Sequence, residues 1–176
     1  MLDVDYSFSD KNVMLRGVTT SAEAKNVLLK ELARKGYAVM DCLELLPDVK
    51  GLEGKTCGII NVSVANMRVA PDFSSEMMTQ SLMGMPVRVL QRDGWVRIQT
   101  PDNYIAWVHR VGVHPVTEEE MAAWNKAEKI VVTAHYGFVY SEPNQTSQTV
   151  SDVVAGNRLK WEGSLSLIHI SEPTRP

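Results

Sequence analysis

Between residues 20 and 36, hydrophobic residues recur at the three-to-four-residue spacing of an α-helix. Thr20 and Glu23 form the T-x-x-E pattern of a capping box, which satisfies backbone N–H groups at a helix start. Gly36 stands where a helix end favours a left-handed residue. The pattern predicts a helix over residues 21–35, with one hydrophobic face formed by Ala24, Val27, Leu28 and Leu32.

A second helical pattern begins after Pro115. Thr117 and Glu120 form another capping box, and the acidic first turn suits the positive end of the helix dipole. The pattern predicts a helical linker over residues 117–128.

Short hydrophobic runs between turn residues fill most of the remaining chain, which is typical of β-strands. One run, residues 37–46, follows the first helix and ends at Pro47. From residue 55 the runs follow closely on one another: CGIINVSVANMRV, PVRVLQ, WVRIQ and YIAWVH. Gly94 and the triplet at 101–103 supply the tight turns. The expected fold class is mainly β, with an N-terminal α/β segment followed by a small β-barrel.

The sequence also contains an internal repeat with an offset of 72 residues, in which Pro71 falls on Pro143 and Gly84 on Gly156. The last strands of the first copy would have counterparts beyond residue 176. We therefore expect an incomplete second barrel whose missing strands leave an open sheet edge and exposed hydrophobic residues such as Val153 and Leu159.

Composition and charge argue against several classes of protein. The chain has 176 residues, 44% of them hydrophobic and 22% charged, as in ordinary globular proteins. A net charge of −3 gives no electrostatic case for nucleic acid or an anionic membrane as partner. No hydrophobic run reaches the roughly 20 residues of a membrane span, and the N-terminus lacks the pattern of a secretory signal. Cys42 and Cys57 could form one disulfide, but the interpretation as free buried thiols is favoured.

The stretch from residue 58 to about 112 resembles a bacterial SH3-like domain. The family pattern is an Asn-x-Arg-x-x-Pro opening, a serine-bearing loop, a Gly before a Val-x-Val strand, a Gly-Trp hairpin and a closing Gly-Trp-Val. Only the closing glycine differs, being Ala106 here. The matching residues are Asn66, Arg68, Pro71, Ser74, Gly84, Val87, Val89, Gly94, Trp95, Trp107 and Val108.

The resemblance, joined to the repeat, divides the chain into five segments. They are an N-terminal α/β segment (1–54), a first bacterial SH3-like domain (55–116), the helical linker (117–128), an incomplete second SH3-like domain (129–163) and a tail (164–176). The tail, which contains LSLIHISEPTR, looks like translated sequencing adapter, so we expect it to be non-native; the alternative is a real tail with LSLIHI as a strand.

Tandem SH3-like domains after a small N-terminal segment resemble the front half of NlpC-type cell-wall cysteine peptidases. In that family a papain-like domain with an Asp-Cys-Ser-Gly motif follows and cleaves the γ-D-glutamyl bond to the diamino acid of peptidoglycan stem peptides. The resemblance implies a non-catalytic chain whose partners are a stem peptide and a peptidase domain in cis, within a parent protein of the cell envelope or periplasm. The alternative is a standalone SH3-like module that binds a peptide or protein.

Five residues are candidate contacts for the stem peptide. Tyr104 follows the turn at 101–103, and the resemblance implies that it helps to enclose the subsite for the free N-terminus of the substrate. Trp95 and Trp107 could line a peptide groove, although the interpretation as barrel core is favoured for both. Arg68 and Asp72 flank the loop at Pro71 and could pair with charged groups of a peptide or with each other.

Catalytic and metal chemistry have weak support. Cys42 follows an Asp, as in the peptidase motif, but it lies in a predicted strand and lacks the Ser-Gly that follows in the family. A hydrolase activity of this chain would rest on Cys42 alone. The spacing of His109, His114 and His135 matches no compact metal motif. We expect neither a metal nor a cofactor.

Overall fold

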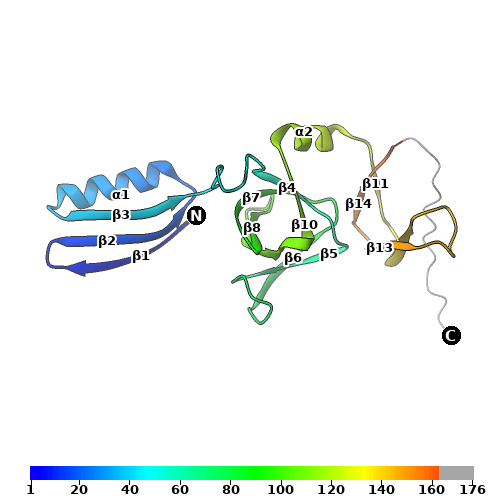
Figure 1. Ribbon diagram of the computed structural model, residues 1–176, viewed down its shortest axis with the longest axis horizontal. Coiled ribbons are helices and arrows are strands. Elements are labelled where there is room, and N and C mark those ends of the chain that lie inside the picture. Colours follow the sequence, from blue (N-terminus) through cyan, green and yellow to red (C-terminus); the bar gives the residue numbers. More distant parts are fainter. Residues whose placement is uncertain (163–176) are drawn as a thin grey trace. The chain divides into compact units, whose positions relative to one another are not determined.

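The computed structural model describes residues 1–162, and the chain divides into one compact unit, Met1–Glu53, and a second that begins at Gly54 (Figure 1). The predicted mainly β fold class is confirmed. The expectations for the tail at 164–176, including LSLIHI as a strand, lie outside the described residues.

The first unit is a three-stranded sheet with one helix. Its elements are β1 (Leu2–Ser9), β2 (Asn12–Thr19), α1 (Ala22–Arg34) and β3 (Ala38–Leu45). β2 is central, antiparallel to β1 and parallel to β3. α1 lies along one face of this sheet (Figure 1). The core between them contains Val13, Leu15, Leu43, Leu28 and Leu32.

The helix prediction is confirmed, but its predicted cap is wrong. Ser21 is the N-cap residue, and its Oγ accepts a hydrogen bond of 3.1 Å from the Ala24 N–H. Thr20 instead accepts a bond of 2.7 Å from the N-terminal amine of Met1. The β1–β2 hairpin places Met1 beside Thr20, so a tertiary contact overrides the local capping pattern. Gly36 has the expected left-handed backbone, with φ of 82°.

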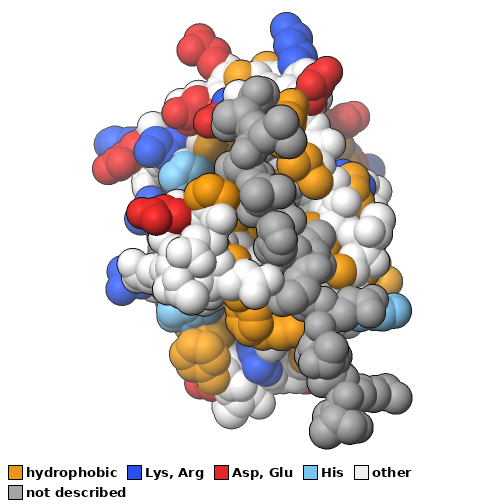
Figure 2. Space-filling view, turned by 90° about the vertical axis from the view of Figure 1, so that its right-hand side faces the viewer, with side chains coloured by type: hydrophobic (Ala, Val, Ile, Leu, Met, Phe, Trp, Pro, Cys, Tyr) orange, Lys and Arg blue, Asp and Glu red, His pale blue; other side chains and the backbone are white. Residues whose placement is uncertain are grey.

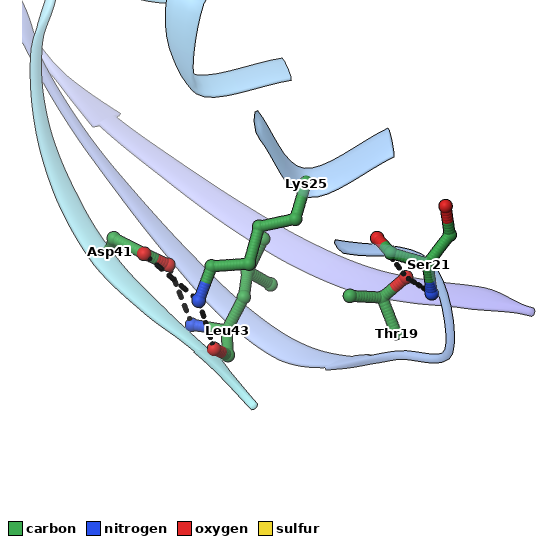
Figure 3. A network of polar contacts seen from close by, with 5 residues as sticks. All are labelled: Thr19, Ser21, Lys25, Asp41 and Leu43. Atoms are coloured by element: carbon green, nitrogen blue, oxygen red, sulfur yellow. Dashed lines mark hydrogen bonds and ion pairs between the residues drawn. The ribbon is translucent and has the colours of Figure 1, made fainter. Parts of the chain in front are cut away.

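A polar network ties α1 to β3 (Figure 3). Lys25 Nζ lies 2.9 Å from Asp41 Oδ2 and donates to the Leu43 carbonyl oxygen at 2.5 Å. Asp41 Oδ1 accepts a bond of 3.0 Å from the Leu43 N–H. The Leu43 N–H, followed by Lys25, holds the pKa of Asp41 below its ordinary value. The ionised carboxylate is therefore the form that stabilises the fold.

We expect Asp41→Asn to lower the free energy of unfolding of the first unit at neutral pH by less than about 1 kcal/mol, because the pair is partly exposed. A carboxyl with a lowered folded-state pKa contributes stability above its unfolded pKa and loses it as the pH falls through its folded pKa. The difference between wild type and Asp41→Asn should therefore shrink as the pH falls through the folded-state pKa of Asp41, which lies below its ordinary value. Urea unfolding from pH 7 to 3 measures it; a pH-independent difference would contradict the assignment.

The second unit opens with a seven-stranded antiparallel sheet in the order β10-β4-β7-β8-β9-β5-β6. The strands are β4 (Cys57–Ile60), β5 (Val64–Arg68), β6 (Met77–Leu82), β7 (Pro86–Asp93), β8 (Trp95–Gln99), β9 (Ile105–His109) and β10 (Val113–Val116), with a 3-10 turn, η1 (Arg110–Gly112), before β10. The two edge strands, β10 and β6, do not pair with each other, so no strand ladder closes the predicted barrel. Two backbone hydrogen bonds join β4 to the β6–β7 turn instead: the Gly84 N–H donates to the Ile60 carbonyl oxygen, and the Ile60 N–H donates to the Met85 carbonyl oxygen.

The interior of this sheet follows strict alternation along β8 and β9, whereas β7 buries the adjacent Val89 and Leu90 at a register shift. Every second residue of β8 and β9 is buried, and β5 and β7 add further core residues. The buried set is Ala65, Met67, Val87, Val89, Leu90, Val96, Ile98, Ala106 and Val108.

The helix predicted after Pro115 is confirmed as α2 (Glu118–Lys126), including its capping box. Thr117 Oγ1 accepts from the Glu120 N–H at 3.2 Å, and Glu120 Oε2 accepts from the Thr117 N–H at 2.8 Å.

Four further strands follow: β11 (Lys129–Val131), β12 (Tyr136–Tyr140), β13 (Thr149–Val154) and β14 (Arg158–Lys160). The bounds of β12 and β13 are those of β5 and β6 shifted by 72 residues. Both pairs carry a bulge at the equivalent position, Met67/Arg68 and Val139/Tyr140. On the face shown in Figure 2, hydrophobic side chains lie among polar ones. Within β11–β14, the exposed hydrophobic residues include Val131, Tyr136 and Val150.

The expectation that Val153 is exposed is wrong. Val153 is fully buried, and it packs with Val132 and with Met83 from the β6–β7 turn. Leu159 is only partly buried against the same cluster. Met83, which follows β6, thus supplies a core residue to the strands after α2, a tertiary contact that the sequence pattern could not reveal.

A buried asparagine reinforces this junction. Asn157 Nδ2 donates to the Ser63 carbonyl oxygen at 2.9 Å, and its Oδ1 accepts from the Val154 N–H at 2.9 Å. Ser63 Oγ also donates to Asp152 Oδ2 at 2.7 Å. Gly84 packs so closely here that an added Cβ would lie 2.3 Å from the Arg158 carbonyl oxygen.

Candidate binding site

The outer face of the β8–β9 hairpin carries an aromatic surface. Because Val96 and Val108 point into the core, Trp95 and His109 point to the other face, where both are half-buried. Trp107 lies on the same face. The favoured placement of both tryptophans in the core is therefore wrong, since aliphatic residues fill it at the alternate positions.

Trp95 takes part in a cluster of three rings. Phe73, from the loop after β5, lies 4.8 Å from Trp95 and 5.1 Å from His109, measured between ring centroids. Trp95 and His109 are 5.3 Å apart in an edge-to-face arrangement. Phe73 is 67% exposed, and together with Trp95 and His109 it forms an aromatic patch of the kind that marks interaction sites. Sequence analysis missed Phe73 and the place of His109, although a bulky aromatic at a polar loop tip was a visible signal.

A pocket of about 200 Å³ opens beside these rings. Trp95, Phe73 and His109 line it together with Arg68 and Val111. The pocket therefore combines apolar walls, aromatic faces and one cation, a combination suited to a short peptide with both apolar and anionic groups.

Arg68 and Asp72 hold the loop that bears Phe73 rather than pairing with each other. Arg68 Nη1 donates to the Ser75 carbonyl oxygen at 2.5 Å. Asp72 Oδ1 accepts from the Ser74 N–H at 2.7 Å and from its hydroxyl at 2.8 Å. The Ser74 backbone bond is the main cause that lowers the pKa of Asp72, so this carboxylate is ionised at neutral pH.

Trp107 lies opposite Arg68 in the β5–β9 pairing. The guanidinium of Arg97 sits 5.5 Å from the centroid of the Trp107 ring, in a cation–π contact. Trp107 thus continues the aromatic surface from Trp95 along the hairpin.

Tyr104 lies at the other end of the hairpin, in the β8–β9 turn, and is 48% exposed. Its N–H donates to Thr100 Oγ1 at 3.1 Å, and Asn103 before it has a left-handed backbone with φ of 69°. The structure therefore brings Trp95, Trp107 and Arg68 together and leaves Tyr104 apart. The binding role of each of these residues stays a prediction.

The two cysteines are free thiols; Cys42 is exposed and Cys57 is half-buried, so the expectation of a buried thiol is wrong for Cys42. Cys42 lies in the middle of β3, in a unit whose sequence contains no histidine to act as its base. Within residues 1–162, no group of three or more His, Cys, Asp or Glu is placed to hold a metal ion. No helix in that part of the chain is long and apolar enough to cross a membrane.

Residues 67–111, which carry this surface, match the family model of the bacterial dipeptidyl-peptidase SH3 domain. None of the curated proteins matches the chain.

Three solved structures are similar. An NlpC/P60 family protein from Bacillus cereus is 20% identical with a TM-score of 0.47, over 67% of this chain and 48% of that one. An NlpC/P60 endopeptidase from Photobacterium damselae subsp. piscicida is 13% identical with a TM-score of 0.52, over 81% and 33%. NlpC2 from Trichomonas vaginalis is 14% identical with a TM-score of 0.31, over 58% and 36%.

At these identities the similarity to the Photobacterium structure concerns the fold. The chain spans about half or less of the length of each of the three structures.

Proposed function

We propose that this chain is the non-catalytic, substrate-positioning region of a peptidoglycan endopeptidase that cleaves the γ-D-glutamyl bond to the diamino acid. The observation that carries the proposal is the aromatic pocket of Phe73, Trp95, His109 and Arg68 within the segment that matches the bacterial dipeptidyl-peptidase SH3 model. The aromatic faces would contact the apolar part of the stem peptide, and Arg68 would attract its carboxylates.

The proposal also covers the domain arrangement, the tail, the parent protein and the residue roles that the resemblance implies. The second set of strands, at the 72-residue offset, is a tandem SH3-like domain, and the segment 164–176 is non-native. The parent protein carries a papain-like peptidase domain in cis and works in the cell envelope or periplasm. Tyr104 faces the free N-terminus of the substrate, and Asp72 keeps the loop of the pocket in place.

The proposal predicts binding of the tripeptide L-Ala-γ-D-Glu-diaminopimelate to the isolated chain. Trp95→Ala should weaken this binding by about tenfold, the loss typical of an aromatic anchor. Trp124→Ala, which removes the same ring from α2, is the matched control and should leave the affinity unchanged. Isothermal titration calorimetry measures both, with thermal unfolding to show that each variant is folded. A folded Trp95→Ala chain with wild-type affinity would contradict the proposal.

The standalone binding module remains the alternative, and the gene distinguishes the two. A reading frame that continues past codon 163 into a domain with an Asp-Cys-Ser-Gly motif supports the peptidase proposal. A genomic stop after codon 176 supports the module.

A further inference from the structure

A second pocket, of about 340 Å³, lies where β4, β7, the β8–β9 turn and α2 meet. It shares no lining residue with the aromatic pocket. Its apolar lining includes Val87 and the buried Met121 of α2. The capping box at Thr117 fixes the start of α2 and thereby the position of Met121.

The pocket also has a polar lining. Arg88 Nη1 donates to Gln99 Oε1 at 3.3 Å, and Gln99 Nε2 donates to Asn103 Oδ1 at 3.3 Å. These long bonds connect a guanidinium and two amides in a row, and Asn125 of α2 adds a third amide to the lining. Arg88 is exposed and belongs to none of the ion pairs found within residues 1–162.

We infer that this pocket binds the C-terminal carboxylate of a peptide whose last residue has a small apolar side chain. The guanidinium of Arg88 offers paired N–H donors that fit a carboxylate. The amides of Gln99, Asn103 and Asn125 can pair with the last peptide group, and the apolar lining at Val87 and Met121 takes the apolar side chain. The inference does not depend on the proposed function, because the two pockets share no lining residue.

Cys57 makes occupancy of the pocket measurable, because it belongs to the lining and is half-buried. Burial is the main cause that raises the pKa of its thiol, with Glu118 adding to the increase and Thr56 and Arg88 opposing it. Reaction with iodoacetamide requires the thiolate and access, so a ligand in the pocket should slow it. The exposed Cys42 of the first unit serves as an internal control.

The test compares three compounds on the full chain by mass spectrometry of the two alkylated cysteines. N-acetylalanine should protect Cys57 and leave Cys42 unprotected. N-acetylalaninamide, which lacks the charge, should need at least about a tenfold higher concentration for the same protection. Sodium propionate, which lacks the peptide group, should also protect less well.

Two arginine variants test whether Arg88 is the group that recognises the carboxylate. Arg88→Gln should remove the preference for the acid over the amide, whereas Arg92→Gln, an exposed arginine of the same strand outside the pocket, should retain it. Equal protection by acid and amide, or an unchanged preference in Arg88→Gln, would overturn the inference. Propionate as effective as N-acetylalanine would overturn the assignment to a peptide terminus, and equal protection of Cys42 would show non-specific binding.

Discussion

Replacing Gly84 by alanine is expected to lower the free energy of unfolding of the second unit by about 3 kcal/mol, a loss at the upper end for single substitutions. Gly84 has a φ of 80°, a conformation that costs a residue with a Cβ about 1 kcal/mol. The new methyl group would also lie 2.3 Å from the Arg158 carbonyl oxygen and 2.7 Å from its Cβ. Arg158 is fixed by its own N–H, which donates to the Met83 carbonyl oxygen at 2.9 Å, so β14 has to move away.

Gly94→Ala is the matched control for this substitution. Gly94 also has a left-handed backbone, with φ of 67°, but no heavy atom lies within 4 Å of its added Cβ. Gly94→Ala should therefore cost only the free energy of holding an alanine in the left-handed conformation, about 1 kcal/mol. Urea unfolding followed by tryptophan fluorescence measures both variants. Equal losses would show that the contact with Arg158 adds nothing.

Asn157→Ala is expected to have a similar effect, a loss of about 3 kcal/mol. Asn157 is fully buried, and both ends of its amide are bonded, to Ser63 and to Val154. Alanine leaves the part-buried Val154 N–H without this partner, which costs about 1–3 kcal/mol. The Ser63 carbonyl loses one bond, worth about 0.5–1.5 kcal/mol, but keeps the bond of 3.3 Å from the Met83 N–H. Hydrogen exchange should show the loss of protection first at the Val154 N–H.

Asn144→Ala is the control for Asn157. Its Oδ1 accepts one bond of 3.0 Å from the Thr146 N–H in an exposed loop, where water can replace the lost partner. We expect a cost of about 1 kcal/mol or less. If Asn157→Ala cost no more than Asn144→Ala, the buried amide would not stabilise the junction.

The elements with strong local signals could be predicted from the sequence. The helix at Ala22–Arg34 followed from its periodicity, and α2 from the capping box of Thr117 and Glu120. The β1–β2 hairpin was missed, although Val4, Tyr6 and Phe8 alternate with polar residues. The turn between these strands has no glycine, and Asp10 adopts its positive φ of 52° instead.

Whether Trp95 and Trp107 belong to the core or to a binding surface depends on which face of their strands is buried. Alternation in IAWVH allows either face to point inward, because Ile105 and Trp107 are on one face and Val108 is on the other. In WVRIQ, Arg97 and Gln99 share the face of Trp95, which was a signal that this face points outward. The structure buries the aliphatic face and turns Trp95 and Trp107 outward. The exposed place of Phe73 at a polar loop tip was visible in the sequence, but its contacts with Trp95 and His109 were not, because both lie more than 20 residues away in the chain.

The burial of Met83 also constrains the order in which the chain can fold. Val132 and Val153 complete their cluster only with Met83, which the first seven-stranded sheet holds in place. A ribosome delivers the first sheet before β11–β14, so the later strands meet a preformed template as they emerge. The same strands expressed without residues 54–116 would lack that template and should stay unstructured. β5–β6 and β12–β13 are therefore unequal partners in assembly, despite their matching strand bounds.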